Sequence, residues 1–186
     1  MENERNLYHD LDGILYTKEQ LAEAVAKLGK QITADYQGKQ PVMICILKGA
    51  SVFFCDLIRQ IDLPLEIDFM VVSSYGASTK TSGEVKLVKD LDRSVQGRDV
   101  IVVEDIVDSG MTLSFLKKNL LNRGAASLRI ATLLDKPARR RVELETDYSC
   151  FEIPDAFVVG YGLDYNETYR NLPDIGILSP RIYAEN

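Results

Sequence analysis

The sequence has no hydrophobic run long enough to cross a membrane. An uninterrupted apolar stretch such as residues 42–47 falls far short of the roughly 18 residues that a spanning helix needs. Residues 1–5 contain two acids, and no apolar segment follows them, which is unlike a secretory signal. We therefore expect a cytoplasmic protein that has no membrane partner.

Cysteine is scarce, and its pattern excludes two classes of small protein. Cys45, Cys55 and Cys150 are an odd number, and no two of them form a C-x-x-C pair. Such a set does not build a disulfide scaffold, and it does not suggest a thiolate metal site. Cys45 and Cys55 lie in apolar stretches, and unpaired cysteines are usually buried. The sequence predicts buried free thiols.

Glycine and proline are also few, with 12 Gly and 6 Pro among 186 residues, so no long low-complexity linker exists. The hydrophobic content of 46% and the charged content of 27% are ordinary for a globular protein. This length predicts one domain over residues 1–186. The net charge of −6 argues weakly against nucleic-acid binding, but a small anion could bind if a divalent metal ion shares its charge.

Helix and strand patterns alternate along the chain, without an internal repeat. Thr17 and Gln20 have the spacing of a capping box that opens a helix. Further helices are predicted over residues 51–60 and from residue 113 to just before Gly124. Strands are predicted at residues 42–47, 67–71, 100–103, 127–134 and 156–160. This order is typical of an α/β fold with a mostly parallel sheet covered by helices.

The loops that follow these strands carry the residues with chemical potential. In open sheets of this kind, ligands bind beyond the carboxyl ends of the strands. Lys48 and Gly49 follow the first of them, and Lys136 follows the strand that ends at residue 134. Residues 73–83 are almost wholly small, polar or glycine. A loop of this kind is either mobile decoration or a working lid.

The most informative loop is predicted over residues 104–112. Glu104 and Asp105 come directly after a buried strand, and a sugar with two neighbouring hydroxyls needs such paired acceptors. Ser109 and Gly110 then open a helix, whose N-terminal N–H groups favour a phosphate. An isolated D-S-G more often caps a helix. The two preceding acids are what favour a phosphate site here.

Residues 103–113, VEDIVDSGMTL, closely resemble the phosphoribosyl-diphosphate-binding signature of the type I phosphoribosyltransferases. The surrounding motifs, from about residue 47 to residue 170, resemble the hypoxanthine-guanine members in order and spacing. The resemblance implies a type I phosphoribosyltransferase fold, with a small hood from residues of about 1–15 and 150–186. It also implies transfer of the 5-phosphoribosyl group from 5-phosphoribosyl 1-diphosphate to hypoxanthine or guanine, which yields pyrophosphate and IMP or GMP in purine salvage.

The resemblance also assigns roles to the 104–112 segment. Glu104 and Asp105 would hold the ribose hydroxyls, directly or through metal and water. Asp108 would act as the general base toward the imidazole ring of the purine. The 5′-phosphate would lie on a loop made by Asp108, Ser109, Gly110, Met111 and Thr112. Many members have Thr where this chain has Ser109, and the hydroxyl donor is retained.

Two other loops would, by the same resemblance, hold pyrophosphate and close the site. Lys48, Gly49 and Arg170 would bind pyrophosphate, with a strained and often cis peptide at the Lys48 position. Ser74 and Tyr75 would belong to a mobile lid that excludes water from the reacting groups. A solvated lysine is the alternative for Lys48, and a surface salt bridge is the alternative for Arg170.

The purine and the metal ion would lie at the remaining motifs. Lys136 would donate to the oxygen at the six-position, which favours 6-oxopurines over adenine. Phe157 would stack on the base and Val158 would read its other edge through the backbone, unless Phe157 is a core residue. Asp164 would ligate Mg²⁺, with Glu104 and Asp105 as further candidates, and a surface salt bridge is the alternative for Asp164.

Three matters stay open at this level. The run Arg139, Arg140 and Arg141 has no secure family role, and a solvated face is the favoured interpretation. Two rival functions are a phosphoribosyltransferase for xanthine or a pyrimidine, and a non-catalytic sensor of the donor that binds nucleic acid through this run. The resemblance further implies a homodimer or a homotetramer.

Overall fold

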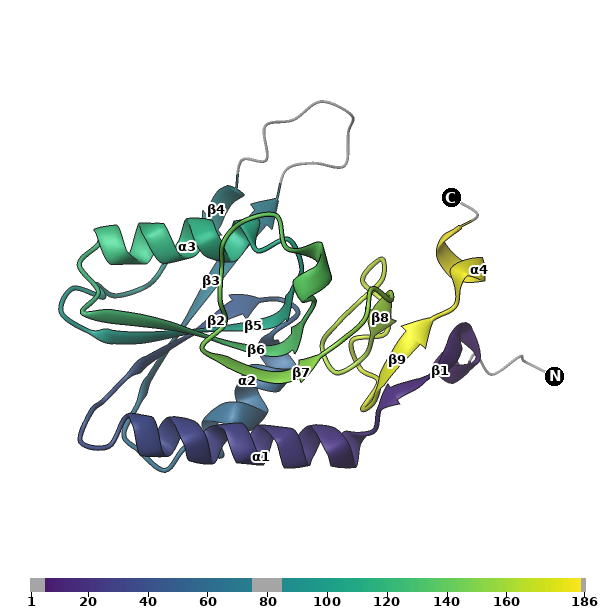
Figure 1. The fold of residues 1–186 in the computed structure, drawn as a ribbon, viewed down its shortest axis with the longest axis horizontal. Coiled ribbons are helices and arrows are strands. Elements are labelled where there is room, and N and C mark those ends of the chain that lie inside the picture. The colour runs from purple at the N-terminus through teal and green to yellow at the C-terminus, as the bar shows by residue number, and fades with distance from the viewer. Residues whose placement is uncertain (1–5, 75–84, 185–186) are drawn as a thin grey trace.

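The computed structural model describes residues 6–74 and 85–184, and these form a large and a small sheet (Figure 1). The large sheet has the strand order β4-β3-β2-β5-β6-β7. Only β3 and β4 pair antiparallel, and the other neighbours pair in parallel. The mostly parallel α/β sheet is therefore confirmed. Its strands are β2 (Val42–Leu47), β3 (Glu66–Ser74), β4 (Val85–Lys89), β5 (Asp99–Val107), β6 (Ser127–Asp135) and β7 (Tyr148–Glu152).

Helices cover both faces of this sheet. Helices α1 (Lys18–Asp35) and α2 (Ser51–Ile58) lie on one face, and α3 (Met111–Asn122) lies on the other (Figure 1). Helix α1 begins with the predicted capping box, in which Thr17 and Gln20 exchange side chain to backbone hydrogen bonds. Helix α2 ends two residues earlier than the predicted range of 51–60. The other helical segments are short. They are the 3₁₀ turns η1 (Leu7–Asp10) and η2 (Pro137–Arg139) and the C-terminal helix α4 (Pro180–Tyr183).

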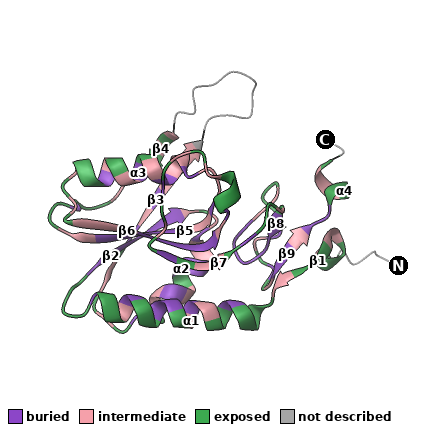
Figure 2. Cartoon of the chain, viewed as in Figure 1, coloured by how far each residue is buried: buried purple, intermediate pink, exposed green. Residues whose placement is uncertain are grey.

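The apolar core forms one layer on each face of the large sheet, as the buried residues in Figure 2 show. One layer packs α1 and α2 on the sheet, and the other packs α3 on its opposite face. In α2 the buried side chains include Phe53, Phe54 and Leu57, whereas Cys55 is exposed on the remaining side of the helix. The predicted burial is therefore wrong for Cys55. Cys45 is fully buried, which raises the pKa of its thiol to about 12.

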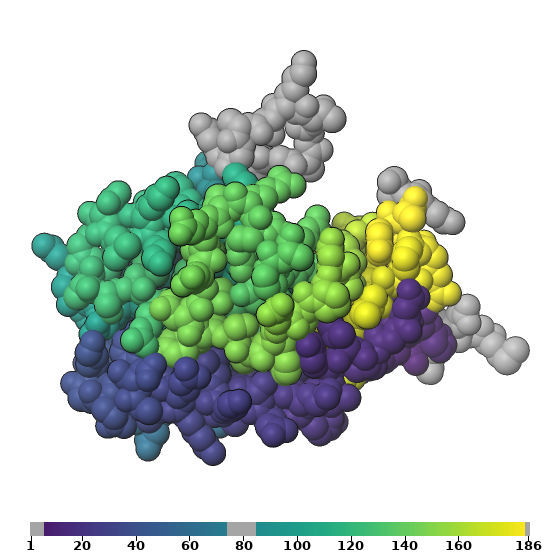
Figure 3. All heavy atoms as spheres, in the orientation of Figure 1, coloured from purple at the N-terminus to yellow at the C-terminus, as the bar shows by residue number. Residues whose placement is uncertain are grey.

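The small sheet joins segments from the two ends of the chain. Strand β9 (Ile175–Leu178) lies between β1 (Leu11–Tyr16) and β8 (Val158–Val159), and both pairings are antiparallel. Figure 3 shows the N-terminal and C-terminal segments packed side by side at one end of the molecule. Polar contacts fix the junction with α1, because Asp174 accepts hydrogen bonds from Lys18 N and from Tyr8 Oη, each at 2.7 Å.

Residues 156–160 differ from their prediction as a strand of the parallel sheet. Only Val158–Val159 are extended, and they pair with β9 in the small sheet. The place beside β6 is taken instead by β7, which the sequence pattern did not predict because exposed and buried positions mix in it. Strand β7 includes residues 150–152, so this part of the range assigned to the hood belongs to the large sheet.

No helix within residues 6–74 and 85–184 is long and apolar enough to cross a membrane.

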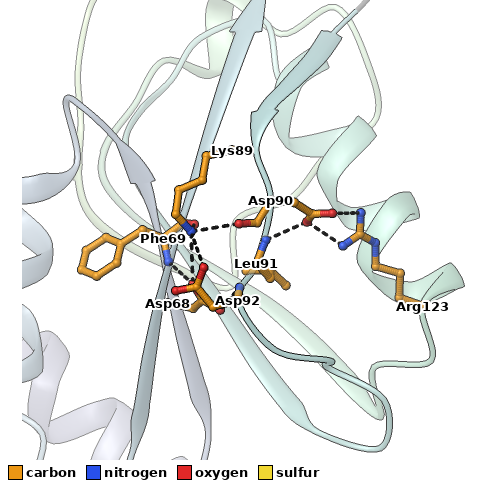
Figure 4. A network of polar contacts seen from close by, with 7 residues as sticks. All are labelled: Asp68, Phe69, Lys89, Asp90, Leu91, Asp92 and Arg123. Carbon is orange, nitrogen blue, oxygen red and sulfur yellow. Dashed lines mark hydrogen bonds and ion pairs between the residues drawn. The ribbon is translucent and has the colours of Figure 1, made fainter.

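A polar network fastens the edge strand β4 to the rest of the large sheet (Figure 4). The buried carboxylate of Asp68 on β3 accepts hydrogen bonds from the backbone N–H groups of Phe69 (2.7 Å) and Asp92 (2.9 Å). Lys89 Nζ lies 3.7 Å from the same carboxylate. Arg123, at the end of α3, donates two hydrogen bonds to Asp90, at 2.6 and 2.9 Å. The end of β4 is thereby tied to both β3 and α3.

We expect Asp68→Ala to lower the free energy of unfolding by about 2–3 kcal/mol, because it leaves two backbone N–H donors without their buried acceptor. Asp92→Ala removes a carboxylate whose side chain is 78% exposed, so it should cost no more than about 0.5 kcal/mol. Urea unfolding of both variants measures the difference. Equal losses in the two variants would contradict a structural role for Asp68.

Candidate active site

Strand β5 is longer than the sequence predicted, and the acids Glu104 and Asp105 belong to the strand itself. The predicted 104–112 loop is wrong over its first half, because β5 stays hydrogen-bonded to β6 as far as the pairing of Val107 with Asp135. Only residues 108–110 form the loop, and α3 begins at Met111. Continued pairing with β6 explains the difference, because β2 pairs with β5 only as far as Val103 and apolar periodicity alone does not show how long a partner strand runs.

The acids Glu104 and Asp105 are half-buried at the end of this strand. Burial, together with the charge of Asp105, raises the pKa of Glu104 well above its ordinary value. Burial also raises the pKa of Asp105, although hydrogen bonds from its surroundings oppose that effect. Ionisation of both carboxyl groups at once is therefore unfavourable when nothing else stabilises the two charges. A cation or several hydrogen-bond donors beside it would stabilise the doubly ionised form.

Three chain segments approach each other so closely at this point that two of them require glycine. A Cβ atom on Gly49 would lie 1.6 Å from Asp105 Oδ2, and one on Gly162 would lie 2.2 Å from the carbonyl oxygen of Gly49. Gly162 also has a φ of +103°, which side chains rarely adopt. The Leu47–Lys48 peptide is cis, as the resemblance implied. The loop after β2, the end of β5 and the loop after β8 thus meet at one place.

A cavity of about 210 Å³ lies where β5 leads into α3. Gly110 is the residue before the helix, with a φ of +78°, and no side chain caps the helix there. Ser109 Oγ accepts a weak hydrogen bond from Met111 N, at 3.4 Å. The N-terminus of α3 therefore keeps N–H groups for a ligand, and anions are the ligands that such groups favour. The cavity is lined by Glu104, Asp105, Ile106, Val107, Asp108, Ser109, Gly110, Thr112 and Leu113.

A second cavity, of about 290 Å³, shares Asp105, Ile106 and Asp108 with the first. It brings together four of the remaining predicted residues, although their motifs are far apart in the sequence. Asp108 thus lies between the two cavities. Its Oδ1 atom is buried and accepts no hydrogen bond from the residues that the structure describes. The other lining residues are Lys136, Arg139, Phe157, Val158, Leu163 and Asp164.

Lys136 and Phe157 flank this second cavity. Lys136 is only 6% exposed and donates a hydrogen bond to the carbonyl of Ala156 at 2.7 Å. Burial lowers the pKa of its amine. Phe157 is 40% exposed, which excludes the alternative of a core phenylalanine. Its ring stacks on Tyr183 of α4 with a centroid separation of 5.1 Å, so the small sheet and the C-terminal helix support this wall of the cavity.

The basic residues predicted to bind pyrophosphate are paired with acids. Arg170 Nη2 lies 2.8 Å from Asp164 Oδ1 and 3.6 Å from Glu167 Oε1. Lys48 Nζ donates to Glu167 Oε2 at 3.0 Å, and this contact lowers the pKa of Glu167. Sequence reasoning missed Glu167, which has a φ of +61°. No pattern marked it, because its role depends on the turn that folds it back toward Lys48.

The arginine run is only in part the solvated face that was predicted, because Arg139 and Arg141 are exposed whereas Arg140 is not. Arg140 has a side chain that is 15% exposed and forms an ion pair with Asp135. Arg139 Nε lies 3.2 Å from Asp108 Oδ1 without the alignment of a hydrogen bond, and its Nη1 donates to Asp155 at 3.1 Å. The run lies close to Lys136 at a strand end, with only Pro137 and Ala138 between them. That position was the signal that could have identified these contacts.

The predicted lid is described only at its first residues. Ser74 is the last residue of β3, where it pairs with Val85 of β4. Tyr75 and the following residues up to 83 lie outside the described residues.

Comparison with known proteins agrees with this arrangement. The pattern of the phosphoribosyl transferase domain matches residues 13–166, and the chain therefore belongs to the phosphoribosyl transferase family. The hypoxanthine-guanine phosphoribosyltransferase of Bacillus subtilis is 54% identical over 175 residues, which cover 94% of this chain and 97% of that protein. A crystal structure of a hypoxanthine phosphoribosyltransferase from Staphylococcus aureus matches with a TM-score of 0.93 and 49% identity, over 98% of this chain and 99% of that one.

Within the family, the chain groups with the hypoxanthine-guanine phosphoribosyltransferases. That of Streptococcus thermophilus (strain CNRZ 1066) is 51% identical over 177 residues, covering 95% of this chain and 98% of the relative. A longer relative is the bifunctional protein TilS/HprT of Listeria monocytogenes serotype 4b, which is 53% identical over 180 residues. The match covers 97% of this chain but only 28% of that protein.

We expect Gly49→Ala to reduce the rate of the phosphoribosyl transfer proposed below at least about a hundredfold, because the new Cβ would displace the Asp105 carboxylate, and misplacement by about 1 Å has effects of that size. Gly13→Ala is a matched control, since a Cβ at Gly13 would meet no atom within 4 Å. Steady-state assays of both variants, with circular dichroism to verify folding, make the comparison. A folded Gly49→Ala variant with the activity of the control would show that the contact is unimportant.

Proposed function

We propose that this chain transfers the 5-phosphoribosyl group from 5-phosphoribosyl 1-diphosphate to hypoxanthine or guanine, releasing pyrophosphate and forming IMP or GMP for purine salvage. The observation that carries the proposal is the place of Asp108. Its carboxylate lies between an anion-favouring helix terminus and a cavity walled by Lys136 and Phe157. The Asp108 side chain is 46% exposed and Arg139 Nε lies 3.2 Å from its Oδ1 atom, so the carboxylate is held at the edge of both cavities and can accept a hydrogen bond from an N–H group of a bound base.

The purine lies in the second cavity. Lys136 approaches it as a cationic donor, which stabilises an oxo group at the six-position and disfavours an amino group there. Phe157 offers an exposed ring face for stacking, and the backbone of Val158 supplies groups for the opposite edge of the base. Asp108 accepts or balances the proton of the imidazole ring while the new glycosidic bond forms.

The donor lies across the first cavity and the place where the loop after β2, the end of β5 and the loop after β8 meet. Its 5′-phosphate binds the N–H groups of the loop from Asp108 to Thr112, and its ribose hydroxyls face the acids Glu104 and Asp105. Cleavage at the anomeric carbon leaves positive charge on the ribose, which these nearby carboxylates stabilise. Ser74 and Tyr75 belong to the lid that would exclude water during this step.

The leaving group binds to the loop of Lys48 and Gly49 and to Arg170. The acids beside the leaving group fit a divalent cation, because Glu104, Asp105 and Asp164 supply carboxylate oxygens, the ligands that such an ion prefers. Asp164 would hold Mg²⁺, with Glu104 and Asp105 as further candidates, and the ion would supply positive charge to the diphosphate when it is bound. No cluster of three or more metal-binding side chains occurs in the described part of the chain. An ion that keeps waters and substrate phosphates as ligands does not require one.

The two rival functions receive less support. A purine site is favoured over a pyrimidine site by Lys136 together with the exposed Phe157 ring. A nucleic-acid-binding sensor is disfavoured because Arg139 and Arg140 form ion pairs with acids of the chain itself. Xanthine remains a candidate third base, since it shares the six-position oxygen. We further propose, on the family resemblance, that the protein is cytoplasmic and forms a homodimer or a homotetramer, which light scattering would measure.

The direct test is a panel of bases assayed for pyrophosphate release. We expect release with hypoxanthine and with guanine, none above background with adenine or uracil, and loss of the reaction when Mg²⁺ is chelated. A gel shift with duplex DNA at physiological salt tests the sensor alternative. Turnover of a pyrimidine, or a gel shift without any transfer activity, would contradict the proposal.

We expect Asp108→Asn to lower kcat about a hundredfold or more while the KM for the donor changes only a few-fold, because the carboxylate acts mainly in the transition state. The variant keeps the backbone carbonyl and the size of the side chain. Asp12→Asn, at an exposed position of β1, removes the same charge outside the site and should match the unsubstituted enzyme. An Asp108→Asn variant with a near-normal kcat would exclude this residue as the general base.

A further inference from the structure

Arg140 occupies an unusual place for a residue in a run of three arginines. Its guanidinium lies between the ends of β5 and β6, with the side chain 15% exposed. Nη1 donates to the carbonyl of Asp108 at 2.8 Å and to that of Val107 at 3.2 Å. Nη2 forms an ion pair with Asp135, whose side chain is 13% exposed. The guanidinium therefore joins two backbone carbonyls at the end of β5 to the Asp135 carboxylate at the end of β6.

Backbone hydrogen bonds surround this bridge and join the same two segments. Lys136 N donates to the carbonyl of Val107 at 2.9 Å, and Arg141 N donates to that of Ser109 at 2.9 Å. Asp135 is held in turn by Thr146 Oγ1 at 3.0 Å. The segment that carries the purine-binding lysine is thus fastened to the loop that carries the general base.

Side chains of the same segment form a wall behind the phosphate loop. A Cβ atom on Gly110 would lie 3.0 Å from Arg140 Cδ and 3.2 Å from atoms of both Val142 and Leu144. Gly110 has a φ of +78°. This backbone conformation favours a glycine at position 110, and the aliphatic part of the Arg140 side chain packs against the turn there.

The bridge also fixes the direction of N–H groups. In a trans peptide the C=O and N–H bonds point in opposite directions. Among the described residues only the Leu47–Lys48 peptide is cis, so the carbonyl of Asp108, held by Arg140, turns the N–H of Ser109 away from that arginine. The carbonyl of Ser109, held by Arg141 N, does the same for the N–H of Gly110. These two N–H groups belong to residues that line the phosphate cavity.

We propose that Arg140 is a positioning residue for phosphoribosyl transfer, which orients the N–H groups of the 5′-phosphate loop and holds that loop in register with the Lys136 segment. This inference rests on the function proposed above and adds a residue to which the family resemblance gave no role. Arg140 acts through the backbone of Asp108 and touches no reacting atom. A charge-assisted bridge of this kind is stronger than a single neutral hydrogen bond.

The test compares two ligands that use different parts of the site. IMP places its phosphate on the 108–112 loop, whereas pyrophosphate with Mg²⁺ binds the segment around Lys48 and Arg170. Arg140→Met keeps the aliphatic stem beside Gly110 and removes the bridge, and Arg140→Lys keeps the charge with a single donor group. Arg141→Ala is the matched control, because it removes an adjacent exposed arginine and keeps the backbone N–H. Titration calorimetry gives both dissociation constants for each protein.

We expect Arg140→Met to weaken IMP binding at least about tenfold and to leave pyrophosphate binding within about twofold, since the loss of charge-assisted hydrogen bonds is confined to one loop. Arg140→Lys should bind IMP with an intermediate affinity, and Arg141→Ala should match the unsubstituted chain. In the assay, the KM for the donor should rise in the same order across the variants. This selective loss separates positioning of the loop from a general loss of structure.

Other results would overturn the inference. Equal weakening of IMP and pyrophosphate would indicate a general structural role, as would unfolding of both Arg140 variants together with Asp135→Asn. IMP binding by Arg140→Met equal to that of Arg141→Ala would show that the bridge has no effect on the loop. Failure of the unsubstituted chain to release pyrophosphate would instead contradict the proposed function itself.

Discussion

The site depends on the contact between the backbone of Gly49 and the carboxylate of Asp105. Because no side chain separates them, the loop after β2 lies directly against the end of β5, and Gly162 packs on the other side of Gly49. Parallel strands bring these loops to the same edge of the sheet. The residues proposed for pyrophosphate, ribose and metal binding then converge without any long side chain to join them.

Charge in this site is balanced by local pairing, even though the chain as a whole carries −6. Arg170 pairs with Asp164, Lys48 with Glu167, and Arg139 with Asp108 and Asp155. Glu104 and Asp105 instead have pKa values raised by burial. An anionic ligand that arrives with a divalent cation would therefore exchange partners with these groups. Such an exchange explains how an acidic protein accommodates a polyanion.

Much of the fold followed from sequence patterns, and the exceptions have physical causes. Helix α1 and strand β2 have strong periodicity or a capping box, and both were predicted correctly. Strands β1, β7 and β9 were not, because β1 and β7 mix exposed and buried positions and β9 is only four residues long, so none shows a clear period. The contacts of Arg140 and Glu167 were also not predicted. Their partners are fixed only when β5 pairs with β6 and when the segment after β8 turns back on itself.

A crystal structure of the protein with IMP tests the central claim most directly, namely that these loops form one nucleotide site. We predict the 5′-phosphate on the N–H groups of residues 109–112, and the six-position oxygen within about 2.7–3.2 Å of Lys136 Nζ, as a hydrogen bond requires. The purine ring should lie on the face of Phe157, with Asp108 beside its imidazole edge. A phosphate bound at Lys48 and Arg170, or a base outside the cavity that contains Lys136, would contradict the account.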